Sequence, residues 1–68
     1  MTKIEKIVAF LMNAETIEKV DNNNFKVDGK KIHFCRGENG FIACKVEGFG
    51  FPVINAEAVT VEMALSGF

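Results

Sequence analysis

The sequence predicts a small α+β protein in the order helix, three-stranded antiparallel meander, helix. Three observations support this: apolar residues recur at helical spacing near each end, alternating apolar segments lie between them, and Asp28-Gly29 is a strong two-residue hairpin signal. With 68 residues, the chain (1–68) is predicted to form one compact domain. Both helices are expected to cover the single apolar face of the sheet.

The composition is that of an ordinary folded domain, with 49% hydrophobic residues, 25% charged residues and a net charge of -1. It excludes a disordered tail and argues against a generally basic nucleic-acid binder. Seven Phe without Trp or Tyr suit a core, because Phe has no polar atom to satisfy. No run approaches the roughly 18 apolar residues that a membrane span needs. We therefore expect a cytoplasmic protein with no membrane partner.

The first helix is predicted over residues 3–13. Thr2 and Glu5 form a capping box at its start. An apolar stripe follows at helical spacing: Ile4, Ile7, Val8 and Leu11. Residues 14–20 fit either a helical turn or a short strand, and residues 21–24 fit a turn.

Strands are predicted at residues 25–27 and 31–35, and a third follows Gly40. The loop before the third strand decides which side chains share a face. A two-residue turn would place Cys35 opposite Cys44, whereas a three-residue loop with a left-handed Gly40 places Phe34 opposite Cys44. Only the second register gathers the apolar residues on one face, so it is preferred. That face carries Ile32, Phe34, Ile42, Cys44 and Val46.

The preferred register predicts two free thiols. Cys35 and Cys44 would point to opposite faces of the sheet and could not form a disulfide. We expect Cys44 in the core and Cys35 on the open face.

The second helix is predicted over residues 56–66. Asn55 is the expected N-cap and Gly67 the expected C′ residue, and Glu57 in the first turn suits the helix dipole. Two glycines and Pro52 interrupt the strand pattern before this helix, so residues 47–52 are predicted to be a bulged strand end or a loop.

Residues for catalysis or metal binding are few. His33 and Cys35 have the spacing of a metal pair, but zinc needs three or four converging ligands. The same two side chains would lie roughly 6–7 Å apart along a strand, too far for a hydrogen bond. Gly48 and Gly50 are not followed by the Lys and the Ser or Thr that a phosphate-binding loop needs. We expect no enzyme, no metal, no cofactor, and no pocket with converging polar groups.

The other face of the sheet is predicted to be basic and to carry one projecting aromatic side chain, Phe41. Such a face could stack a base or hold phosphates. It would equally suit a solvated face whose lysines prevent aggregation of edge strands. The candidate nucleic-acid-binding residues are Lys26, Lys31, His33 and Lys45.

The predicted order of elements is similar to that of the double-stranded-RNA-binding domain. The segment Gly48-Phe49-Gly50 also resembles that family's stretch before its last helix. Where that family has a lysine pair opening the last helix, this chain has Val53 and Ile54, and Glu57 and Glu62 follow in the helix. The resemblance therefore implies a topology and does not extend to phosphate binding.

The function predicted from these patterns is non-catalytic binding of another protein or of a second copy of this chain. The chain has more large apolar side chains, Phe68 among them, than so small a core can bury. An adaptor or an inhibitor, such as those of phages and mobile elements, would fit; RNA or single-stranded nucleic-acid binding through the basic face is the alternative. The expected partner-binding residues are Phe41, Phe49, Phe51, Val53 and Ile54.

Overall fold

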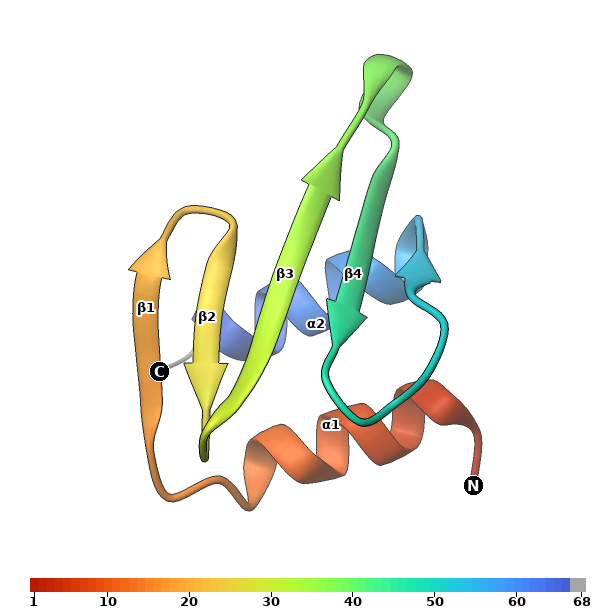
Figure 1. Cartoon of the computed structure of the whole chain (residues 1–68). Helices are drawn as coiled ribbons and strands as arrows, with labels where there is room; N and C mark the ends of the chain where they lie inside the picture. Colours follow the sequence, from red (N-terminus) through yellow and green to blue (C-terminus); the bar gives the residue numbers. More distant parts are fainter. Residues whose placement is uncertain (67–68) are drawn as a thin grey trace.

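The computed structural model of the chain describes residues 1–66, which form two helices and one five-stranded antiparallel sheet (Figure 1). The sheet order β1-β2-β3-β4-β5 follows the sequence. The elements are α1 (Lys3–Met12), β1 (Ile17–Asp21), β2 (Asn24–Val27), β3 (Lys30–Arg36), the 3-10 turn η1 (Glu38–Gly40), β4 (Ile42–Val46), β5 (Val53–Ile54) and α2 (Ala56–Ser66). The α+β class and both helices are confirmed. Gly67 and Phe68 lie outside the described residues.

The predicted count of three strands is wrong, because both ends of the meander are extended. Residues 14–20, which fitted either a helical turn or a short strand, contain most of β1, and Ile17 of this strand pairs with Val27. At the other edge β5 pairs with β4 through only two residues, Val53 and Ile54. A two-residue strand has no alternation to detect, and it follows a proline. With five strands, the sheet also departs from the topology that the RNA-binding family suggested.

The predicted register of the meander is confirmed. Phe34 is the partner of Cys44, and Ile32 is the partner of both Phe25 and Val46. The loop between β3 and β4 closes with the Gly37 N–H donating to the Phe41 carbonyl at 2.9 Å, which leaves three residues in it. Gly40 has φ +76°, the left-handed conformation that such a loop requires.

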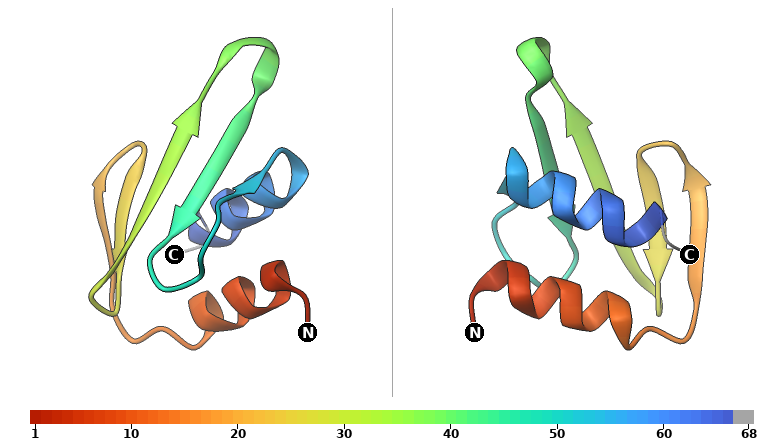
Figure 2. Two further views of the ribbon diagram at one scale, coloured as in Figure 1. Left: turned by 45° about the vertical axis from the view of Figure 1, so that its right-hand side comes forward. Right: turned by 180° about the vertical axis from the view of Figure 1, so that it is seen from behind.

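Both helices lie on one side of the sheet, where α2 runs across the strands and α1 lies beside it (Figure 2). The inner sides of the two helices and the apolar face of the sheet pack together in one core cluster. Phe34 lies near its centre at 1% exposure, and its ring meets that of Phe25 edge to face at 5.9 Å. The buried apolar residues are Ile7, Leu11, Val27, Ile32, Phe34, Ile42, Cys44, Val46, Val53, Ala58, Val61 and Leu65.

Local hydrogen bonds fix the two helix starts differently. The capping box of α1 is present: the Glu5 N–H donates to Thr2 Oγ1, and the Thr2 N–H donates to Glu5 Oε1. At α2 the predicted N-cap is not an ordinary one. Asn55 has φ 55°, whereas a capping residue is normally extended; its carbonyl still accepts from the Val59 N–H at 3.0 Å.

One turn carboxylate joins α1 to the sheet. Asp28, with φ 48° at the β2–β3 turn, accepts hydrogen bonds from the backbone N–H groups of Glu15 and Thr16 at 2.9–3.3 Å. These bonds lower the pKa of Asp28 below its usual value, and the bond from the Thr16 N–H has the largest effect. Asp28 therefore fixes the connection between α1 and β1 as well as its own turn.

We expect Phe34→Ala to lower the free energy of unfolding by about 3–5 kcal/mol, because it opens a cavity in the centre of the core. The matched control, Phe41→Ala, removes a ring that is 43% exposed and should cost less than about 1 kcal/mol. Urea denaturation followed by circular dichroism measures both. Equal losses in the two variants would contradict the assignment of the faces.

We expect Asp28→Asn to be less stable than the native protein at neutral pH, because Asn keeps the turn but loses the charged acceptor. The native carboxylate's contribution is present above its unfolded pKa and is lost as the pH falls through its lowered folded pKa. The difference between the two proteins should therefore shrink in acid. Urea denaturation from neutral pH to about pH 2 tests this.

The control for this acid series is Glu18→Gln, an exposed acid that makes no side-chain hydrogen bond within residues 1–66. The interpretation of Asp28 fails if Asp28→Asn and the native protein differ equally at every pH.

Candidate functional site

The face of the sheet opposite the helices is open to solvent in the part of the chain that the structure describes. Strand alternation sends every second side chain there, and the four basic residues expected on this face are all exposed. Three of them, Lys31, His33 and Lys45, line a shallow hollow of about 260 Å³ together with Glu47. The structure thus brings these basic residues together, with an acid beside them.

Acidic side chains accompany the basic ones across this face. Glu18 is the register partner of Lys26, and the Lys31 N–H donates to Glu47 Oε1 at 3.0 Å. His33 Nδ1 lies 2.8 Å from Asn24 Oδ1, and the Asn24 amide in turn donates to Asp21. The open face, which the sequence predicts to be basic, therefore carries acidic side chains among its basic ones.

The end of the open face near β5 is apolar. Ala43 is the register partner of both Cys35 and Ile54, so these three side chains form a row across β3, β4 and β5. Phe41 precedes Ala43 by two residues on the same face. Its ring lies over Gly37, where a Cβ atom would come within 3.1 Å of Phe41 Cδ1. Phe41 is 43% exposed and Ile54 46%.

The five predicted partner-binding residues divide between the surface and the core. Val53 is only 5% exposed, and Phe49 packs on the core with its ring 5.6 Å from that of Phe10. Val53 is therefore buried in the core, whereas Phe49 is partly buried against it. Phe51 is 87% exposed in the segment leading into β5, where Lys3 Nζ donates to its carbonyl and lies 5.9 Å from its ring centroid.

We name the residues that a partner can reach here the edge surface. It comprises Cys35, Phe41, Ala43 and Ile54. Phe51 is exposed but lies apart from these residues, beside Lys3 of α1. Alternation on β3 and β4 predicted Cys35 and Ala43 on this face, but only the pairing of β5 with β4 brings Ile54 beside them.

Sequence reasoning missed a second apolar surface, on the outside of the helices. A groove of about 500 Å³ runs between α1 and α2. The signal was present in α1, because an outer line of apolar residues runs beside the inner pair Ile7 and Leu11. The groove is lined mainly by Met1, Ile4, Val8, Ala9, Met12 and Thr60.

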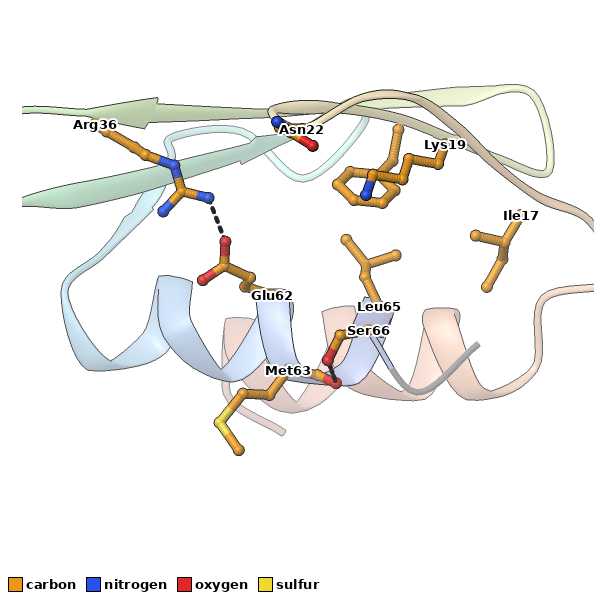
Figure 3. A pocket seen from close by; sticks show the side chains of 9 residues that line it. Ile17, Lys19, Asn22, Arg36, Glu62, Met63, Leu65 and Ser66 are labelled. Atoms are coloured by element: carbon orange, nitrogen blue, oxygen red, sulfur yellow. Dashed lines mark hydrogen bonds and ion pairs between the residues drawn. The ribbon is translucent and has the colours of Figure 1, made fainter.

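A pocket of about 690 Å³ lies between the β1–β2 hairpin and the C-terminal half of α2 (Figure 3). The prediction that no pocket with converging polar groups would be found is wrong. Sequence analysis missed it because its lining comes from β1, β2, β3 and α2, and the first of these was not assigned as a strand. The lining residues are Ile17, Lys19, Asn22, Phe25, Arg36, Glu62, Met63, Leu65 and Ser66.

An ion pair spans this pocket from the sheet to the helix. Arg36 lies at the end of β3 on the helix side, and its Nη2 donates to Glu62 on α2. Its Nε donates to Asn23 Oδ1 at 2.9 Å. The two side chains are 44% and 37% exposed, so the pair contributes modestly to stability. It does hold the guanidinium in one orientation.

The two thiols lie on opposite faces, as the register predicts, and both are free. Burial, with a smaller contribution from the nearby charge of Glu62, raises the pKa of Cys44 to about 12. Cys35 is exposed on the edge surface. Only Cys35 is placed to meet a reagent in solution.

Within residues 1–66 no three His, Cys, Asp or Glu side chains gather closely enough to hold a metal ion. Over the same residues, neither helix has the length and apolar content to cross a bilayer.

The chain was compared with protein-family models, with curated proteins and with solved structures, and no match was found. The geometry described above therefore carries the functional argument.

We expect a thiol reagent to label one cysteine in the native protein and two after denaturation. Cys35 reacts because it is exposed, whereas Cys44 is 1% exposed and its high pKa leaves almost no thiolate at neutral pH. Mass spectrometry of the labelled protein measures the count. Cys35→Ser should abolish native labelling; rapid labelling of that variant would show that the β3–β4 register is wrong.

Proposed function

We propose that the protein is a non-catalytic binding module that holds a partner protein on its edge surface. The observation that supports this best is the position of Phe41 and Ile54, two large apolar side chains that are nearly half exposed on the uncovered face. Such side chains, in a small domain that needs its apolar residues for the core, are typical of interaction sites.

The backbone beneath the edge surface is well suited to binding. Ala43 and Ile54 are fixed by strand pairing, and the Phe41 ring lies against Gly37. A rigid aromatic anchor loses little conformational entropy when a partner covers it, so more of its contact energy appears as affinity. Small neighbours such as Ala43 leave room for a partner's side chain between the larger ones.

Charge around the edge surface indicates the chemistry of the partner. The neighbouring row of the open face holds His33 and Lys45, which are register partners. Glu47 lies beside these two residues, so a partner with apolar side chains at its centre and charges of both signs at its rim would complement this arrangement. An adaptor or an inhibitor that occupies an apolar site with a polar rim on another protein fits this description.

Nucleic-acid binding is supported less well. Lys26, Lys31 and Lys45 share the open face with Asp21, Glu18 and Glu47, so three lysines meet three carboxylates there. Phosphate binding depends on a surplus of positive charge, which this face does not offer.

We expect the double variant Phe41→Ala/Ile54→Ala to lose partner binding by at least about tenfold, because it truncates both central anchors. The full chain is immobilised, and proteins retained from native cell extract are quantified by mass spectrometry. The matched control is Lys26→Gln/Lys31→Gln, which changes the same face away from the edge surface and should retain the same partner.

Three results would oppose the proposal. The partner could remain bound to the double variant, or it could be lost from the lysine control. Alternatively, the protein could bind an oligonucleotide at low salt, with an affinity that falls steeply as salt is added and depends on the lysines. Light scattering of the native protein and the double variant shows whether the occupant is a second copy.

A further inference from the structure

We propose that the pocket between the β1–β2 hairpin and α2 is a second site, which binds a small amphiphilic carboxylate. The apolar body of the ligand would lie on Phe25 and Leu65, and its carboxylate would lie between Lys19 and Arg36. This site is on the helix side of the sheet, opposite the edge surface, and is independent of it.

The shape of the pocket follows from the geometry of the two layers. The helix α2 packs against β4 and β5, while the β1–β2 hairpin lies at the far side of the sheet (Figure 2). Ile17 and Phe25 consequently remain only partly buried although they face the helices. The resulting space of about 690 Å³ is within the range of small-molecule sites.

The inner wall is apolar and rigid. The Phe25 ring meets the buried Phe34 ring edge to face, with an angle of 82° between the planes. Leu65, which is 3% exposed, approaches from α2 (Figure 3). Ile17 and Phe25 are only partly buried, so a hydrocarbon chain or an aromatic ring lying against them would cover apolar surface that is exposed to water.

Polar groups stand on the other walls, and their charges determine the sign of the ligand. Lys19 and Arg36 contribute two positive charges and Glu62 one negative charge, so the sum is +1. Glu62 already accepts from Arg36, and the Lys19 ammonium makes no ion pair among the described residues. A single negative charge on the ligand balances the set.

The Arg36 guanidinium is already oriented to bind the carboxylate of the ligand. Its Nε and Nη2 are held by Asn23 and Glu62, while the guanidinium has five N–H donors in all. The remaining N–H groups can donate to a carboxylate without reorganisation of the side chain, which favours binding. A planar carboxylate matches this group better than a bulky or a cationic head would.

The test uses octanoate as the probe and follows the backbone amides of the full chain by NMR. We expect saturable shifts centred on Lys19, Phe25, Leu65 and Ser66. Acetate has the carboxylate without the apolar body, and octylammonium has the body with the opposite charge. Both should bind at least about tenfold more weakly than octanoate.

Variants distinguish this site from general adsorption. Lys19→Gln should weaken octanoate binding several-fold, and Glu62→Gln should strengthen it, because the first removes a positive charge and the second a negative one. Lys26→Gln, on the open face, is the matched control and should leave the affinity unchanged. Lys19, Glu62 and Lys26 are not buried, and circular dichroism verifies that each variant is folded.

The inference is overturned if octanoate gives no saturable shift up to about 10 mM. It is also overturned if octylammonium binds as well as octanoate, or if Lys26→Gln weakens binding as much as Lys19→Gln does. Partner binding at the edge surface is unaffected by any of these outcomes.

Discussion

The register between β3 and β4 is the constraint on which the rest of the structure depends. Side chains alternate along a strand, so a shift of one residue would move Phe34 and Cys44 from the core to the surface. Asn39 and Gly40, with φ 58° and 76°, close the loop so that this does not occur. Two left-handed residues in a three-residue loop thus decide which half of the side chains meets the helices.

The helices follow from that choice. Once the apolar face is fixed on one side, Ile7 and Leu11 of α1 and Val61 of α2 have a single surface on which to pack. In α2 the buried Ala58 is small, which permits a close approach to the sheet. The same helix also carries exposed Val59 and Met63, so apolar side chains lie on more than one side of α2 and do not by themselves select the side that packs. Contacts with a correctly sided sheet orient it instead.

The extent to which the sequence predicts the molecule follows from the range of the interactions involved. The α1 capping box, the Asp28-Gly29 turn and the β3–β4 register depend on near neighbours and on alternation, and all were predicted correctly. In β5, Val53 pairs with Cys44, and a glycine-containing segment separates the two residues in the sequence. No local sequence pattern predicts this pairing. For the same reason the sequence predicts Val53 as a partner-binding residue, whereas it is buried in the core. The pocket also depends on β1 (Ile17–Asp21). No residue of this strand is fully buried and its register shifts between Lys19 and Asp21, so it lacks the alternation that would predict a strand.

The alternation that buries Phe34 also separates the two proposed sites. On β3 the residue after Phe34, Cys35, points to the edge surface, and the next, Arg36, points to the pocket. Adjacent residues therefore serve opposite faces, with the packed core between them. A one-residue slip of this strand would exchange Cys35 and Arg36 between the faces, placing a charge on the edge surface and a thiol in the pocket, so both sites depend on the loop that fixes the register.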